Sequence, residues 1–261
     1  MINKTNYYNA IFLLGGHDLE MLEIMEMFES KKLTVYDENL QWDNAKLSKY
    51  GEKLNDTDIF VGIELVTDIK PPVNYLLIDH HNENAEKPSA IEQVADLLGI
   101  TLNNDQQLVA ANDKGYIPAM EAMGATPKEI EDIRSRDRKA QGAIDEDERL
   151  GEKSIKEHSY YKGDLLIVKS LTNRFSTITD RLWGKTNKLL IYNEESLTYY
   201  GQNIDKLITQ FSVLIEEKTA YYGGNPPGFF GVDFKKIKFE EKVIITNKLI
   251  DLIYGTNEKS L

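Results

Sequence analysis

One short stretch of the chain places three groups capable of chemistry directly after an apolar run. Leu76–Ile78 is followed by Asp79, His80 and His81. A buried strand that ends in a carboxylate and two imidazoles is typical of a ligand site at the edge of an open α/β sheet. These groups suit Mn²⁺, Fe²⁺ or Zn²⁺, and a carboxylate-rich set favours the harder Mn²⁺ or Mg²⁺. The alternative is that Asp79 caps a turn and that both histidines are ordinary surface residues.

The placement of the four histidines favours a site. His17, like His80 and His81, follows an apolar, strand-like run, whereas His158 lies in a polar segment and is expected to be solvated. Chance would scatter these residues, so three histidines after apolar runs indicate a common role.

Other apolar runs deliver acidic residues to the same edge. Because the carboxyl ends of parallel strands lie together, residues far apart in the sequence are expected to converge there. Two divalent ions about 3.5–4 Å apart could bridge a water, lower its pKa and clamp phosphoryl oxygens. The candidate metal ligands are His17, Asp18, Glu20, Glu64, Asp79, His80 and Asp113.

The composition narrows the classes of partner. With 43 acidic and 31 basic residues, the chain has no basic excess for long duplex nucleic acid, but a small phosphorylated substrate remains compatible. The absence of cysteine excludes disulfides and thiolate metal ligands. No signal-like start or long apolar run is present, so we expect a cytoplasmic protein that does not contact membranes.

The pattern of elements predicts two α/β domains joined by a linker. Alternating strands and helices in residues 1–126 predict a parallel sheet with helices on both faces. Residues 127–160 carry mixed charges at helical offsets, which favours an exposed helical linker. Residues 161–261 restart the pattern as a smaller mixed α/β domain, in which the glycine- and proline-rich segment 221–231 is expected to interrupt regular structure.

The triplet Asp79-His80-His81 at a strand end resembles the signature of the DHH phosphoesterases, and the order of the other acids matches theirs. The resemblance implies a two-domain hydrolase with dinuclear manganese in a cleft between the domains. It also implies the following roles: Asp18 and Glu20 match the first acidic motif, Glu64 the bridging acid, His80 a metal ligand and Asp113 the last acidic motif, while Asp79 and His81 support the metals or contact phosphate.

The resemblance extends to the second half of the chain. The segment from Gly223 to Gly228, which includes Gly224 and Asn225, resembles the glycine-rich phosphate-binding loop of the DHH-associated domain. Arg174, just before a predicted helix, could bind substrate phosphate bidentately through its guanidinium. Gly223, Gly224, Asn225 and Arg174 are therefore the predicted substrate-binding residues.

The chain departs from the family pattern at several positions. Glu20 and Glu64 stand where aspartate is usual, and the longer side chain could alter the spacing of the metals. His17 abuts Asp18 without the usual spacer, which restricts its reach toward the same ion. Asn225 stands where the loop usually offers a histidine, and an amide cannot shuttle a proton.

The leading hypothesis is a manganese-dependent phosphoesterase that hydrolyses a short oligonucleotide, a nucleoside bisphosphate or a cyclic dinucleotide by metal-activated water. Asp79, His80 and His81 are its predicted catalytic residues. One alternative is a manganese pyrophosphatase or polyphosphatase, and another is a nucleotide-binding protein that has lost hydrolysis. Two Mn²⁺ ions are expected, Mg²⁺ is an alternative metal, and a homodimer is compatible with the sequence.

Overall fold

A computed structural model describes residues 7–224 and 228–254. The chain divides into two compact units, Met1–Gly142 and Ala143–Leu261. This division falls within residues 127–160, the segment whose charges predict a linker. Helix α4 (Pro127–Ala140) precedes the division and helix α5 (Asp145–Glu157) follows it.

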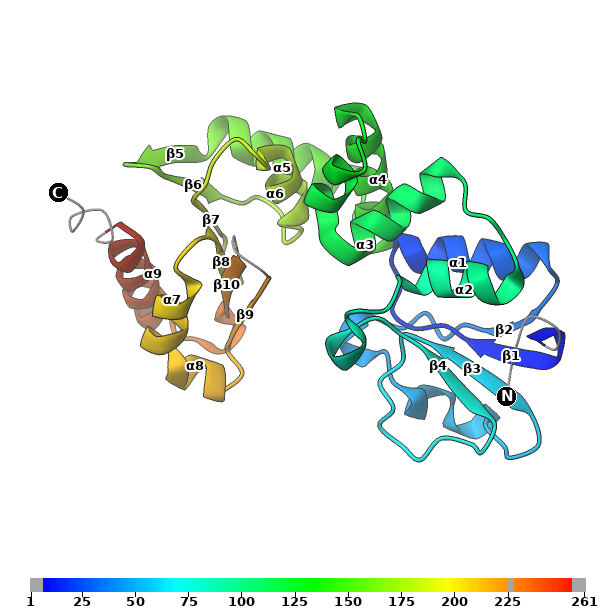
Figure 1. Cartoon of the computed structure of the whole chain (residues 1–261). Coiled ribbons are helices and arrows are strands. Elements are labelled where there is room, and N and C mark those ends of the chain that lie inside the picture. The colour runs from blue at the N-terminus through cyan, green and yellow to red at the C-terminus, as the bar shows by residue number, and fades with distance from the viewer. Residues whose placement is uncertain (1–6, 225–227, 255–261) are drawn as a thin grey trace. The chain divides into compact units, whose positions relative to one another are not determined.

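The first unit is built on a four-stranded parallel sheet with the order β2-β1-β3-β4. In the pairing of β3 with β4, Ile63 lies opposite Ile78, so these strands end side by side. Figure 1 shows all four strands beneath α1 and α2. The strands are β1 (Ala10–Leu13), β2 (Thr34–Tyr36), β3 (Ile59–Ile63) and β4 (Tyr75–Ile78); the α-helices besides α4 are α1 (Leu19–Ser30), α2 (Ala90–Leu98) and α3 (Asn104–Ala122); the 3-10 helices are η1 (Tyr7–Asn9), η2 (Trp42–Asn44), η3 (Leu47–Lys53) and η4 (Asn82–Asn84).

Neighbouring residues of these strands pack on opposite faces of the sheet, as the pleat requires. Phe12 belongs to the core that α1 and α2 cover, whereas Leu13 belongs to a second core that includes Tyr50 of η3. The predicted parallel sheet with helices on both faces is therefore confirmed. One face carries α-helices and the other is covered by a segment containing 3-10 helices.

Helix starts and one helix break follow from the local sequence. Asp18 caps α1 by accepting a hydrogen bond from the backbone N–H of Met21 at 2.8 Å, and Ser89 opens α2 with a capping box. Helix α3 is broken at Gly115 and Tyr116, and Tyr116 has φ 60° and ψ −150°. Pro118 lies just after the break; a proline lacks an N–H, and in a continuous helix its ring would clash with the preceding turn.

Helix α4 corrects one expectation from the sequence. Its mixed charges predict an exposed helix, but Arg134, Asp137 and Arg138 are buried. The reason is tertiary, because Arg134 forms an ion pair with Asp137 within the helix and also reaches Asn112 of α3. Charge pattern alone does not distinguish a solvated face from a buried polar network.

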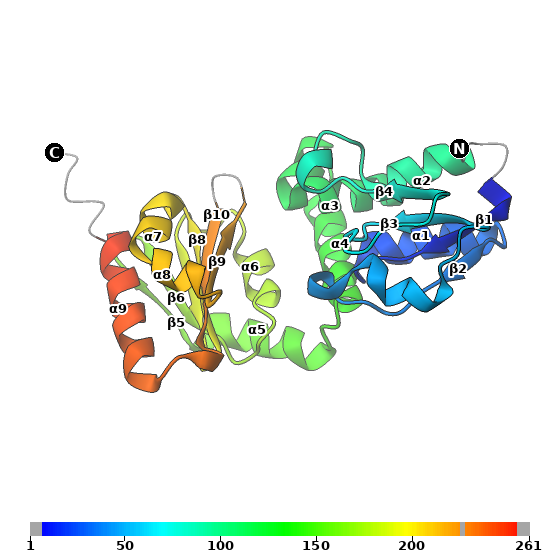
Figure 2. The same cartoon turned by 90° about the horizontal axis from the view of Figure 1, so that it is seen from below.

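The second unit has a mixed six-stranded sheet with the order β5-β6-β7-β8-β10-β9, as expected for a mixed α/β fold. Among the described strands of this sheet, only β6 and β7 pair in parallel, and α6 connects them. Figure 2 shows α5 and α6 on one side of this sheet and α7, α8 and α9 on the other. The elements are β5 (Ser159–Lys162), β6 (Leu165–Lys169), α6 (Ser176–Leu182), β7 (Leu189–Tyr192), β8 (Ser196–Gly201), α7 (Ile204–Gln210), α8 (Ser212–Glu216), β9 (Ala220–Gly223), β10 (Gly228–Asp233), η5 (Phe234–Lys236) and α9 (Phe239–Tyr254).

Strands β9 and β10 correct the expectation that residues 221–231 form no regular structure. Strand β10 is hydrogen-bonded to β8 on one side and to β9 on the other. Its glycines serve packing, because a Cβ at Gly231 would lie 2.2 Å from the ring of Tyr221. Long-range pairing thus overrides the local preference of a glycine-rich sequence for turns.

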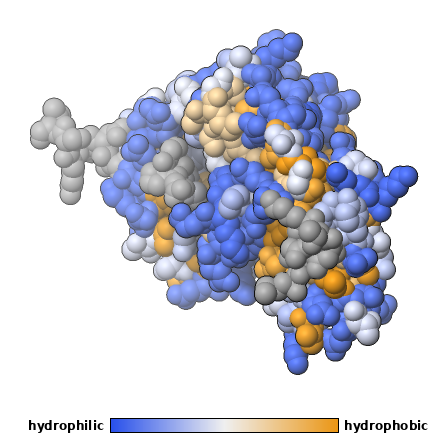
Figure 3. Space-filling view, turned by 45° about the vertical axis from the view of Figure 1, so that its right-hand side comes forward, coloured by the Kyte–Doolittle hydropathy of each residue, from blue (hydrophilic) through white to orange (hydrophobic). Residues whose placement is uncertain are grey.

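On the face shown in Figure 3, hydrophilic residues predominate and hydrophobic residues form smaller patches between them. Among the described helices, none combines the length and the apolar character needed to span a bilayer.

Candidate metal centre

Four side chains of the first unit form a compact group of potential metal ligands. Glu20, Glu64, His80 and Asp113 each offer one ligand atom, and these atoms lie within 4.8 Å of one another. Glu64 follows β3 and His80 follows β4, so the paired ends of two parallel strands bring them together. Glu20 comes from the first turn of α1, and Asp113 from the part of α3 just before its break.

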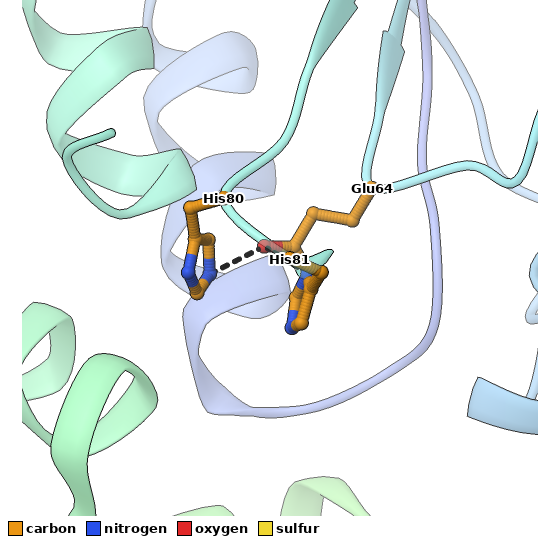
Figure 4. A group of neighbouring side chains, drawn as sticks. All are labelled: Glu64, His80 and His81. Carbon is orange, nitrogen blue, oxygen red and sulfur yellow. Dashed lines mark ion pairs between the residues drawn. The ribbon is translucent and has the colours of Figure 1, made fainter. Parts of the chain in front are cut away.

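His80 lies at the middle of this group. Its Nε2 is 2.5 Å from Oδ2 of Asp113, 2.9 Å from Oε1 of Glu64 and 3.9 Å from Oε2 of Glu20. Figure 4 shows the carboxylate of Glu64 pointing toward the ring of His80, with His81 on its other side. Three carboxylates and one imidazole nitrogen thus face a common point.

The facing atoms are buried and lack aligned hydrogen bonds within the described part of the chain. They are Oε2 of Glu20, both carboxylate oxygens of Glu64, Nε2 of His80 and Oδ2 of Asp113. Buried polar atoms of this kind are costly unless something satisfies them. Oxygen and imidazole donors that converge in this way fit a divalent cation.

The electrostatics of the centre indicate a surplus of negative charge. Burial and the nearby Asp113 raise the pKa of Glu20 well above its usual range. Burial also raises the pKa of Glu64. For His80 burial acts in the opposite direction, but the contacts with Asp113 and Glu64 outweigh it and raise the pKa to about 10. A bound cation would offset the repulsion among these carboxylates.

Glu64 occupies an uncommon backbone conformation. Its φ is 52°, in the left-handed region, which costs a non-glycine residue on the order of 1–3 kcal/mol. Gly15 permits the close packing beside it, because a Cβ there would lie 2.5 Å from the carbonyl oxygen of Ile63 and 2.7 Å from that of Glu64. The turn at Glu64 is therefore maintained by its surroundings.

Asp79 contacts His81 and is not one of the four converging donors. Its Oδ1 lies 3.0 Å from Nδ1 of His81, and its Oδ2 accepts a hydrogen bond from Asn84 at 2.9 Å. Burial opposes ionisation of Asp79, but the bonds from Asn84 and His81 outweigh it and lower its pKa. An ionised carboxylate only accepts, so Nδ1 of His81 carries the proton and Nε2 is left for another partner.

The two histidines of the triplet differ in access. The side chain of His81 is 37% exposed, whereas that of His80 is 5% exposed. His80 is therefore suited to a buried ligand role and His81 to contact with a substrate. Glu64, His80 and His81 also form a second group of potential ligands, but it shares two of its three members with the first.

The remaining predicted ligands lie outside the four-donor group. Asp18 is buried and caps α1, and burial together with Asp113 raises its pKa. His17 has its Nε2 3.0 Å from both carboxylate oxygens of Asp37. The backbone N–H of His17 donates a hydrogen bond to the carbonyl of Leu40, which holds the turn between β1 and α1 in place.

The predicted substrate-binding residues of the second unit are separated. Gly223 ends β9, Gly224 follows with φ 77°, and Asn225 lies outside the described residues. Arg174 lines a cavity of about 630 Å³ at the end of the sheet where β6 and β7 finish.

The strand pairing places the glycine turn at the opposite end of that sheet. Gly228 starts β10 opposite Gly201, whereas Asp233 ends it opposite Ser196, beside the end of β7. A six-residue strand spans about 20 Å. Arg174 and the glycine turn therefore lie at opposite ends of this sheet, and the assignment of each to substrate binding stays a prediction.

The structure adds residues that the sequence analysis did not select. A cavity of about 410 Å³ in the first unit is lined by residues that include Asp18, Asp113, Trp42, Tyr116 and Arg134. One feature of the sequence could have identified Trp42, because this large aromatic residue stands between the polar residues Gln41 and Asp43. Arg134 had none, because its charge resembles that of its exposed neighbours.

Comparison with known proteins gives structural matches without sequence matches. No protein-family model matches the chain, and no curated protein does. A pGpG-specific phosphodiesterase, PggH from Vibrio cholerae, aligns with TM-score 0.48 and 14% identity over 94% of this chain and 99% of that one. RecJ from Thermus thermophilus, in complex with Mn²⁺, aligns with TM-score 0.48 and 12% identity over 94% of this chain and 52% of that one.

Another solved structure aligns with a higher TM-score than these two. The DHH domain of a protein described as a member of the s1p family of ribosomal proteins aligns with TM-score 0.51 and 10% identity, over 92% of this chain and 86% of that one. The similarity spans both units of the chain. The protein therefore has the fold of DHH-domain proteins.

Proposed function

We propose that this protein is a divalent-metal-dependent phosphoesterase that hydrolyses a small phosphorylated nucleotide. The observation that carries the proposal is the group formed by Glu20, Glu64, His80 and Asp113, whose buried, unsatisfied atoms converge at the carboxyl edge of a parallel sheet. Three carboxylates and one imidazole suit Mn²⁺ best among the common divalent ions, with Mg²⁺ as the alternative. The DHH fold agrees with this reading.

The geometry favours one firmly held ion, where the sequence suggests two. The second potential ligand group reuses Glu64 and His80 and adds only His81. His17 is engaged with Asp37, so it adds no donor to either group. We therefore expect one ion at the four-donor centre, and a second ion would depend on the other oxygen of Glu64 together with His81.

The surrounding side chains suggest how hydrolysis would proceed. A divalent ion at the centre would polarise the phosphoryl oxygens and lower the pKa of a coordinated water. The four donors would hold that ion in a fixed position at the edge of the sheet. In its doubly protonated form, His81 would keep its Nδ1–H bonded to Asp79 and would give the proton on Nε2 to the departing alkoxide, which returns the ring to its neutral state.

The substrate class follows from charge and from the size of the neighbouring cavity. A net charge of −12 disfavours long nucleic acid, as the sequence indicates. The cavity of about 410 Å³ beside Asp113 is in the range of small-molecule sites. Short oligonucleotides, nucleoside bisphosphates and cyclic dinucleotides are the candidates.

The test is a turnover assay with metal-stripped, full-length protein. Mn²⁺ is added back in the presence of a fluorescent dinucleotide, adenosine 3′,5′-bisphosphate, cyclic di-AMP or pyrophosphate. His80→Gln is the variant at the centre, and His158→Gln is the matched control because His158 lies in the second unit at the end of α5. Metal content is measured for all three proteins.

The outcomes separate the hypotheses. Mn²⁺-dependent release of mononucleotide or phosphate that His80→Gln loses and His158→Gln keeps supports the proposal and identifies the substrate class. Cleavage of pyrophosphate alone would favour the pyrophosphatase alternative. Bound metal without turnover would favour a nucleotide-binding protein, and failure to bind metal would overturn the assignment of the centre.

A further inference from the structure

Trp42 lies beside the candidate metal centre with its side chain incompletely buried. The residue is 41% exposed, and its ring centroid lies 5.1 Å from that of His81 at an interplanar angle of 69°. A tryptophan buries more apolar area than almost any other residue when it is packed in a core. An indole that stays this exposed next to His81 is available to contact a ligand at the site.

The backbone around Trp42 holds the indole in place. Gly16 lies directly against it, since a Cβ there would come within 3.1 Å of the Trp42 Cα and of two indole atoms. On either side, the carbonyl of Leu40 accepts the N–H of His17 at 3.0 Å and the N–H of Asn44 donates to the carbonyl of Gln41 at 2.9 Å. The indole is therefore supported by a fixed turn, as a preorganised contact surface requires.

Trp42 and the metal centre share one cavity. Trp42 and Asp113 both line the cavity of about 410 Å³, and Asp113 is also one of the four converging donors. A ligand with one end at the centre can thus extend along Trp42. The cavity also contains Tyr116, but its ring already lies against the guanidinium of Arg134, with the Arg134 Cζ 4.5 Å from its centroid.

We propose that Trp42 is the stacking surface for a nucleobase and that it makes this cavity a nucleoside subsite of the first unit. The inference rests on the function proposed above and adds the part of the substrate that is recognised. Every base has a π face, and stacking on an aromatic side chain contributes to affinity without regard to sequence. Inorganic pyrophosphate has no group for this surface, so the subsite selects nucleotides over it.

The chemistry of the cavity wall agrees with a neutral, planar ligand part. Besides Trp42, the wall includes the amide side chains of Asn112 and Gln141, the acids Asp18 and Asp137, and the cations Lys114 and Arg134. Arg134 is paired with Asp137, and the Lys114 ammonium donates hydrogen bonds to the backbone carbonyls of Ala85 and Lys87, so both cations of the wall already have partners. The arrangement therefore separates an anionic end at the centre from an uncharged aromatic end at Trp42.

Direct binding tests the proposal without requiring turnover. The chain has two tryptophans, so Trp183→Phe leaves Trp42 as its only indole. Full-length Trp183→Phe is titrated with AMP and with ribose 5-phosphate, which has the same phosphate but no base, in the presence of Mg²⁺. We expect AMP to quench the fluorescence of Trp42 and to bind at least about tenfold more tightly than ribose 5-phosphate.

Substitution of Trp42 supplies the second measurement. In an otherwise natural chain, Trp42→Ala should weaken AMP about tenfold and leave ribose 5-phosphate unchanged, whereas Trp42→Phe should retain most of the affinity. Tyr160→Ala is the matched control, because Tyr160 is an exposed aromatic residue of the second unit. Comparison of the natural chain with Trp42→Ala also isolates the Trp42 signal if Trp183→Phe does not fold.

The two proposals fail in different ways. Equal affinity for AMP and ribose 5-phosphate, or equal weakening of both in Trp42→Ala, would overturn the nucleobase subsite even if phosphoesterase activity is found. Quenching by AMP that persists in a chain without hydrolytic activity would support the subsite while the proposed reaction fails.

Discussion

Arg134 donates a hydrogen bond from Nη1 to Oδ1 of Asn112, 2.9 Å away, and so ties α4 to the residue directly before Asp113. The same Nη1 donates to Oδ2 of Asp137 at 2.6 Å, and the guanidinium lies over the ring of Tyr116. Arg134 therefore braces the end of the helical segment that carries Asp113, just before the break in α3. A buried arginine of α4 thus positions one of the four donors.

Substitution of Arg134 should lower both the stability of the fold and the metal affinity of the four-donor centre. In Arg134→Met, Asp137 is left buried without its cation, so we expect a loss of about 3–5 kcal/mol in the free energy of unfolding. Misplacement of Asp113 should lower metal affinity about 10–100-fold. Urea denaturation and titration calorimetry measure the two effects. Arg149→Met is the control, since its ion pair with Glu146 is exposed and its loss should change neither quantity.

The stability of the metal-free protein should fall as pH rises. Asp18, Glu20, Glu64 and His80 all have raised pKa values in the folded state, so folding favours their protonated forms. This stability is fully present below the unfolded-state values and is lost as pH rises through the folded ones. For His80 the window runs from 6.5 to about 10.

Scanning calorimetry between pH 5 and pH 9 checks this linkage. We expect the melting temperature of the metal-free protein to decrease across that range, and the stabilisation by Mn²⁺ to increase as its binding displaces protons. At 100 times the dissociation constant, a bound ion adds about 2.7 kcal/mol. A melting temperature of the metal-free protein that rises steadily with pH would contradict the assignment.

The substitution Glu20→Gln should stabilise the metal-free protein and at the same time weaken metal binding. Oε1 of Glu20 accepts a hydrogen bond from the N–H of Ile91 at 3.0 Å, and the glutamine carbonyl can keep that bond. Because the variant removes a buried charge, its metal-free form should unfold at a higher urea concentration than the natural protein at pH 8. Its metal affinity should fall at least about tenfold. Equal metal affinity in both proteins would exclude Glu20 as a ligand.

Asp79→Asn should affect turnover more than metal binding. The amide would no longer enforce the Nδ1–H form of His81, so proton transfer to the leaving group should slow about 100-fold or more. Metal affinity should fall much less than turnover, because Asp79 is not among the four converging donors. Assays of turnover and metal content on one preparation test this. A parallel loss of metal would show that Asp79 is a ligand.

The sequence predicted the parts of the fold that depend on local signals. Apolar runs located β1, β3 and β4, and side-chain caps located the starts of α1 and α2. The rule that parallel strands end at one edge explains why Glu64 and His80 lie together. These features follow from spacing and residue type within short segments.

Features that depend on contacts between segments far apart in the chain could not be predicted from the sequence. The burial of Arg134 requires Asn112 of another helix, and the pairing of β10 requires β8 and β9 on its two sides. The separation of Arg174 from Gly223 is a property of strand direction, which no local pattern encodes. The left-handed turn at Glu64 likewise depends on packing against Gly15.

The pairing of β3 with β4 also determines which changes in chain length the first unit can accept. Glu64 and Asp79 directly follow Ile63 and Ile78, the last paired residues of the two strands. An insertion within either strand would shift the following side chains by about 3.3 Å and turn them to the other face of the sheet. Residues 69–73 lie outside this pairing, so insertions and deletions among natural variants should collect there while both strands keep their lengths.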